Sequence, residues 1–169
     1  MPLMKWLPSA APSALLPRMK VFAILLTLSA LALAEPPKPD RILKLWENAK
    51  PPGDFTVPGP ETLTPADKNG IARLTNVSEP RLDFFSPGKK NGAAVIIVPG
   101  GGFGILASEH EGSELAVWFR DRGFVAAVLQ HRCPTNKLAK PWEFPAWDAQ
   151  RAVSALTAAV PRSIATGTA

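Results

Sequence analysis

The chain has 169 residues, and 19 Lys and Arg against 14 Asp and Glu give a formal net charge of +5 at pH 7. Three of the basic residues and none of the acids precede Ala34, so the later charge is nearly balanced, and no basic run exceeds Lys89-Lys90. This pattern argues against a nucleic-acid partner. The single cysteine, Cys133, excludes an internal disulfide and lacks metal-ligand spacing, so no metal or other cofactor is expected.

The first 34 residues have the pattern of a secretory signal peptide. Lys20 precedes the apolar run Val21 to Ala34, which ends in an Ala-x-Ala cleavage site before Glu35. A helix over this run would span about 21 Å, short of the ~30 Å hydrocarbon core, so no stable membrane span is expected after cleavage. We expect a secreted or periplasmic product, with Met19 as an alternative start.

Residues 35–70 are rich in proline, which predicts an extended arm with one short helix at 41–48. After the arm, apolar residues at 71–77 and 81–86 predict two strands, and we expect them to form an antiparallel hairpin.

A domain over 71–157 then follows the strand–helix–strand pattern of an α/β protein. The apolar run 93–98 predicts a buried strand, residues 112–122 a helix that stops at Gly123, and 124–129 a parallel strand. A last helix is predicted at 147–157. The small and polar residues 158–169 have no core-forming period and form an atypical tail.

Three consecutive glycines, Gly100 to Gly102, follow the buried strand 93–98. Side chains this small leave backbone N–H groups bare, so the amides of Gly101 and Gly102 are the candidate oxyanion hole. A flexible connection is the simpler alternative. Residues 102–107 also match the G-x-G-x-x-A turn of dinucleotide-binding domains, but the next strand ends in Gln130 where that site needs an acid.

His110 and Glu111 are adjacent at a helix start, so they diverge and cannot act as a base with its orienting acid. Ser108 and Glu111 instead predict a capping box. His131 lies at the C-terminal end of a strand, which is where open α/β sheets place their active sites. A packed, hydrogen-bonded histidine is the simpler prediction.

Asp148 and Arg151 are spaced to form an ion pair on a helix, or to tie that helix to the loop after Cys133. Trp118, Trp142 and Trp147 are expected in the core or a lid, with sugar stacking as an alternative for the last two.

Four motifs occur in the order of one protein group: Pro-Gly-Gly-Gly at 99–102, His-Glu-Gly at 110–112, Gln-His-Arg-Cys-Pro at 130–134 and Asp-Ala-Gln-Arg at 148–151. Over about 74–156 the chain thereby resembles secreted bacterial α/β-hydrolases similar to acetylxylan and feruloyl esterases. The resemblance implies the N-terminal part of an α/β-hydrolase fold, with an entry hairpin leading into a parallel sheet. It also implies an acylated carbohydrate or other small ester as substrate, with Phe103 and His110 as candidate substrate-binding residues.

The group uses a G-x-S-x-G nucleophile motif, and no serine of this chain has those neighbours. The 135 residues after the leader are also fewer than the ~200 to 250 of larger single α/β domains. We therefore expect an incomplete hydrolase that carries the oxyanion-hole half, lacks the nucleophile, acid and histidine of the triad, and is inactive by itself. The alternative is a non-catalytic secreted α/β or carbohydrate-binding fragment.

Overall fold

The computed structural model describes residues 36–160. The leader, predicted over 1–34, and residues 161–169 of the predicted tail lie outside the described residues. Within residues 36–160, no helix is both long and apolar enough to cross a membrane.

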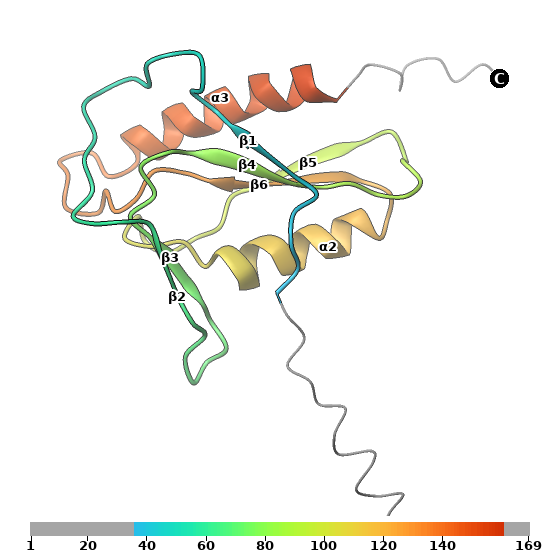
Figure 1. The fold of residues 1–169 in the computed structure, drawn as a ribbon, viewed down its shortest axis with the longest axis horizontal. Coiled ribbons are helices and arrows are strands. Elements are labelled where there is room, and N and C mark those ends of the chain that lie inside the picture. Colours follow the sequence, from blue (N-terminus) through green and yellow to red (C-terminus); the bar gives the residue numbers. More distant parts are fainter. Residues whose placement is uncertain (1–35, 161–169) are drawn as a thin grey trace, which may run out of the picture. The chain divides into compact units, whose positions relative to one another are not determined.

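A four-stranded mixed sheet is the centre of this part of the chain (Figure 1). Its strand order is β1-β4-β6-β5, in which β4 pairs antiparallel with both β1 and β6, and β5 runs parallel to β6. The parallel pair confirms the strand–helix–strand unit expected from 93–129. The strands of this sheet are β1 (Arg41–Lys44), β4 (Arg81–Phe85), β5 (Ala94–Ile97) and β6 (Val125–Gln130).

Helices cover both faces of the sheet, which is why β6 is apolar and buried along nearly its whole length (Figure 1). On one face, α3 (Glu143–Ala159) packs Ala152 and Leu156 against alternate residues of β4 and β6. On the other face, α2 (Glu114–Arg120) packs Ala116 against the intervening residues, among them Phe85 and Val128. The described part of the chain is therefore a mixed sheet with few helices, which cover both of its faces.

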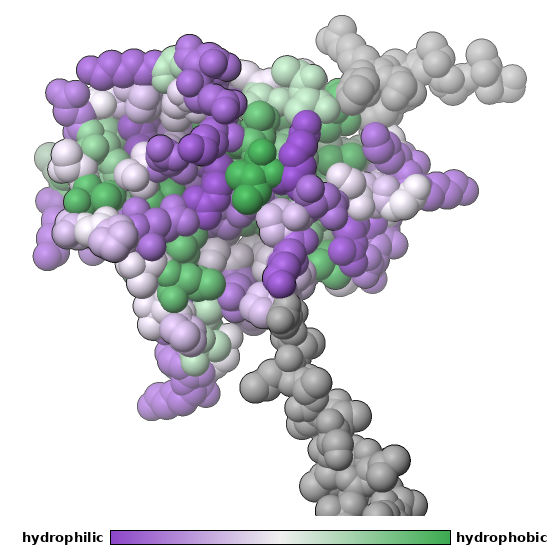
Figure 2. Space-filling model, in the orientation of Figure 1, coloured by the Kyte–Doolittle hydropathy of each residue, from purple (hydrophilic) through white to green (hydrophobic). Residues whose placement is uncertain are grey.

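The predicted helix at 41–48 is wrong, because this segment forms β1 and a turn. Eight residues are too few for a stable isolated helix, whereas the edge of β4 offers backbone partners. Asp40 N–H donates to the Phe84 carbonyl at 2.8 Å, and Leu45 N–H donates to the Pro80 carbonyl at 3.0 Å. Part of the expected arm thus belongs to the sheet. Ile42 of β1 is exposed, and apolar surface lies over this part of the molecule in Figure 2.

The predicted hairpin between 71–77 and 81–86 is also wrong, although both segments contain strands. The first strand, β3 (Arg73–Thr75), pairs with β2 (Thr62–Thr64) in a separate two-stranded ribbon, while β4 joins the main sheet. Val77, between them, instead forms a bridge with Cys133. The chain turns away after β3 because Leu74, Val77, Leu106 and Cys133 build a small core of their own.

The helices begin earlier than the sequence predicts. A π-helical turn, η2 (Ser108–Ser113), precedes α2, and Gly123 ends that helix at a φ of 87°, as expected. Gly112 lets η2 approach the sheet, since a Cβ there would lie 3.0 Å from the Val128 side chain. In α3, the first turn includes Pro145, which is tolerated because amides there have no partner within the helix.

Candidate functional site: a glycine loop at the end of β5

The candidate site begins where β5 ends and the chain turns at Pro99 toward η2. The carbonyl groups of this loop are used internally. Gly100 O accepts from Ala107 N–H at 2.9 Å, and Gly101 O accepts from Gly104 N–H at 3.1 Å. The amides of Gly101 and Gly102, in contrast, donate to no group among the described residues, and both residues are exposed. Two adjacent N–H donors thus remain available to an outside acceptor.

The loop backbone is held in a conformation that L-residues avoid. Gly101 has a φ of 145°, and a Cβ at that position would lie 2.1 Å from the Ile105 carbonyl oxygen. Gly102 and Phe103 have φ values of 60° and 62°. Such a conformation in an aromatic residue is unusual and points to a functional constraint. Phe103 is held by its carbonyl, which accepts from Thr135 N–H at 2.7 Å, and the residue is 38% exposed.

The predicted capping box is wrong. Ser108 makes no side-chain cap, and the Glu111 carboxylate accepts a hydrogen bond from Gly100 N–H at 2.7 Å. The wider π-helical turn changes which backbone donors face the side chains, so the spacing of an α-helical capping box does not apply. Glu111 therefore braces the first glycine of the loop and leaves the amides of Gly101 and Gly102 as the open donors.

His110 does not pair with Glu111, as expected from their divergence. Its Nδ1 lies 3.5 Å from Glu114 Oε2, and both side chains are more than half exposed. His110 also lines a shallow hollow on the outer side of α2, with Leu115 and Trp118 among its neighbours. Its role in substrate binding stays a prediction, as does that of Phe103.

His131 is a packed, hydrogen-bonded histidine, as the simpler prediction had it. Its side chain is buried, and Nδ1 lies 3.0 Å from the Arg132 carbonyl oxygen. Burial lowers the pKa of His131, against the opposing effect of hydrogen bonds to the Arg132 and Pro99 backbone. His131 thereby connects the end of β6 to Pro99, the residue before the glycine loop.

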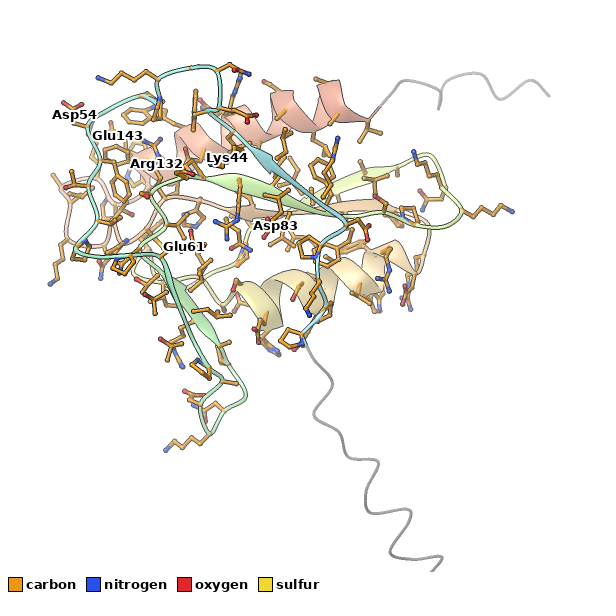
Figure 3. The ribbon with its side chains drawn as sticks, viewed as in Figure 1. Lys44, Asp54, Glu61, Asp83, Arg132 and Glu143 are labelled. Atoms are coloured by element: carbon orange, nitrogen blue, oxygen red, sulfur yellow. The ribbon has the colours of Figure 1, made fainter. Side chains whose placement is uncertain are left out.

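A buried ion pair, which the sequence does not reveal, fixes the same end of the sheet. Asp148 of α3 accepts from Arg132 through the backbone N–H at 2.9 Å, Nε at 3.0 Å and Nη2 at 2.9 Å. It also accepts from Trp46 Nε1 at 3.0 Å. Arg132 lies where α3 begins, close to the 50–55 segment (Figure 3), and donates to the Pro52 carbonyl.

The predicted Asp148–Arg151 ion pair is therefore wrong, since Arg151 Nε donates to the Leu45 carbonyl instead. The alternative prediction, a tie between the helix and the loop after Cys133, is nearer to what the structure shows. Asp148 binds Arg132, which is the residue just before Cys133. Burial raises the pKa of the Cys133 thiol, which keeps it protonated and unreactive.

Two of the three tryptophans predicted in the core or a lid are about half exposed. These are Trp118, whose ring lies under the Arg122 guanidinium at 3.7 Å, and Trp142. Trp147 packs edge-on against Phe144 at 5.3 Å. Within residues 36–160, no group of three or more His, Cys, Asp or Glu side chains is placed to hold a metal ion.

Comparison with known proteins gives a partial match. No family model matches the chain. Over 67 residues it is 31% identical to a protein of Xylanibacter ruminicola, and these residues make up 40% of this chain and 14% of that protein. That relative is an acetylxylan esterase. The resemblance to acetylxylan esterases that the four motifs predict is confirmed to this extent.

A solved structure, the acetyl ester-xyloside bifunctional hydrolase from Caldicellulosiruptor lactoaceticus, has a TM-score of 0.47 and 25% sequence identity. The match covers 73% of this chain and 37% of that one. The chain thus spans a minor part of the length of both proteins.

Proposed function

We propose that this chain contributes the oxyanion loop of an exported carbohydrate ester hydrolase of acetylxylan-esterase type. The observation that carries the proposal is the pair of open amides at Gly101 and Gly102, held by a backbone that only glycine can adopt at Gly101. The local similarity to an acetylxylan esterase supports the choice of ester and substrate class.

In this proposal the two amides act on the substrate's acyl group. Attack on an ester carbonyl places negative charge on its oxygen, and N–H donors already aimed at that oxygen stabilise the tetrahedral intermediate. Each such donor contributes about 2.7 to 4 kcal/mol of transition-state stabilisation in enzymes of this kind. Glu111 and the Gly100 and Gly101 carbonyl contacts hold the loop so that no reorganisation is needed during the reaction.

A chimera tests the assignment of the loop. Residues 81–135 of this chain replace the corresponding segment of the Xylanibacter ruminicola acetylxylan esterase, and acetate release from acetylated xylan is measured. We expect an active chimera in which Gly101→Ala lowers kcat by about 100- to 1,000-fold, the loss typical of one oxyanion donor. Gly88→Ala is the control, because Gly88 is exposed and a Cβ there meets no atom.

Circular dichroism checks that each chimera is folded. A folded chimera whose kcat is the same with and without Gly101→Ala would overturn the oxyanion role. Because no serine in the 169 residues has G-x-S-x-G neighbours, we also expect the chain alone to hydrolyse p-nitrophenyl acetate no faster than an inert protein of equal mass. Saturable turnover that Gly101→Ala abolishes would contradict this second expectation.

A further inference from the structure

The two edges of the central sheet differ in how they are protected against pairing with another strand. The β1 edge carries Arg41 and Lys44, and charged side chains on an edge strand discourage a second chain from adding to it. The β5 edge has no such protection, because neither Ala94–Ile97 nor the following Val98 is charged. Among the residues that the structure describes, only β6 pairs with β5. One edge of the sheet is therefore both open and uncharged.

The free backbone groups of β5 belong to alternate residues. The Ala93 carbonyl accepts from Val125 N–H at 3.1 Å, so the backbone of Ala93 faces β6. The N–H and C=O groups of successive strand residues point to opposite sides of the strand, so every second residue from Ala93 onward faces β6 and the others face away. The residues whose backbone faces away from the sheet are Ala94, Ile96 and Val98. Their N–H and C=O groups meet no strand within residues 36–160.

The helix α3 adds exposed apolar surface beside this edge. Residues two positions apart in an α-helix lie about 200° from each other around the helix axis. Arg151 Nε donates to the Leu45 carbonyl, just after β1, so Val153 lies on the opposite side of α3. That side faces β5, since β1 and β5 are the two ends of the sheet. Val153 is 59% exposed and Val98 is 53% exposed, so apolar surface accompanies the free backbone groups.

This edge is complementary to itself. When two β5 strands pair antiparallel about a two-fold axis, Ile96 lies opposite Ile96 of the second copy, and Ala94 lies opposite the second copy's Val98. This register pairs the outward N–H and C=O groups of all these residues, whereas a shift by two residues leaves some of them unpaired. A two-fold axis also brings identical surfaces together, so that like charges would repel. Because β5 carries no charge, a second copy meets no such repulsion.

We propose that two copies of this chain associate through their β5 strands, antiparallel and about a two-fold axis. The pairing joins the two four-stranded sheets into one continuous sheet. It occupies the open edge of each copy and leaves the charged β1 edges on the outside, so the assembly closes as a dimer and does not grow into a fibre. The dimer does not depend on ester hydrolysis and uses no amide of the glycine loop.

Sedimentation velocity of the full chain over a dilution series tests the proposal. We expect a monomer–dimer equilibrium in the parent chain. Ala94→Lys and Val98→Glu should each raise the concentration of half-dissociation by about tenfold or more, because each places a charge opposite an apolar side chain of the second copy. An equimolar mixture of the two variants should dimerise more strongly than either variant alone. In the mixed dimer, the new ammonium group of one chain lies opposite the new carboxylate of the other.

The double variant, Ala94→Lys with Val98→Glu, should dimerise nearly as well as the parent chain. The two positions lie ~13 Å apart along one strand, too far to pair within a chain, so the recovery requires a second copy. Ala158→Lys changes an exposed residue of α3 and is the control, which should leave the dimer unchanged. Circular dichroism checks that each variant is folded.

Three results would overturn the proposal. The first is a parent chain that stays monomeric at every concentration, as expected if another segment of the same chain covers β5. The second is a dimer that neither single variant weakens, which would place the interface elsewhere. The third is a mixture and a double variant that dimerise no better than the single variants, which would exclude the antiparallel register. Failure of the chimera assay would leave these results unaffected.

Discussion

Replacing Asp148 with Asn should unfold the chain at much lower denaturant concentration, because it leaves the Arg132 guanidinium buried without its counter-ion. Asp148 accepts from the Arg132 backbone, two Arg132 side-chain nitrogens and Trp46 Nε1, and both partners of the ion pair are almost fully buried. An Asn amide keeps one oxygen and turns an NH₂ group toward these donors.

Breaking a buried pair by removing one partner costs about 3 to 5 kcal/mol. This is a large share of the ~5 to 15 kcal/mol that stabilises a typical domain. With a urea m-value of about 2 kcal/mol/M, the unfolding midpoint should fall by roughly 2 M. The assay is urea unfolding of the full chain followed by tryptophan fluorescence at low protein concentration.

Glu79→Gln is the matched control, since it makes the same chemical change in an ion pair that is exposed on both sides, Lys44–Glu79. We expect its midpoint to stay close to that of the parent chain. A second variant, Asp148→Leu with Arg132→Met, leaves no charge buried and should recover part of the loss. An Asp148→Asn midpoint no lower than that of Glu79→Gln would refute the view that this pair holds α3 to the sheet.

Three further changes test other parts of the structure. Gly101→Ala should lower the free energy of unfolding by about 1 to 3 kcal/mol, because its Cβ would clash with the Ile105 carbonyl oxygen at a φ of 145°. Equal urea unfolding midpoints for Gly101→Ala and Gly88→Ala would contradict this. Burial raises the pKa of Asp83, so the folded state holds that proton more firmly and stability is lost as the pH rises from the unfolded pKa through the folded one. Asp83→Asn should therefore gain stability relative to the parent chain as the pH rises above the ordinary pKa of an aspartate in urea titrations, and a relative loss would show that the sign is wrong. Finally, β5 pairs only with β6 among the described residues, so its other edge is open to association with a second chain. Ala94→Lys on β5 should therefore reduce concentration-dependent light scattering, whereas Ala158→Lys on α3 should not. Equal scattering by the two variants would rule out association through the β5 edge.

The strands and helices of the central unit were predictable because their patterns are local. The apolar runs at 93–98 and 124–129 indicate parallel strands, and Gly123 marks a helix end by its own backbone preference. The predicted burial holds for β6 but not for β5, which lies at the edge of the described sheet and buries only Ile97. The segment 41–48 failed for the opposite reason. Its apolar spacing suits a short helix, but the edge of β4 offers a full set of backbone partners that the pattern does not contain.

The sequence by itself determined where the glycine loop lies, since three glycines after an apolar strand predict a loop whose backbone no side chain of its own covers. Only the tertiary structure decided which side chain accepts a hydrogen bond from that loop. It also decided which polar side chains, far apart in the sequence, pair with one another. Glu111 reaches Gly100 because η2 forms a π-helical turn, and Asp148 meets Trp46 across 102 positions of the chain. Such pairs depend on where the backbone carries each side chain, and a linear pattern records spacing along the chain rather than proximity in space.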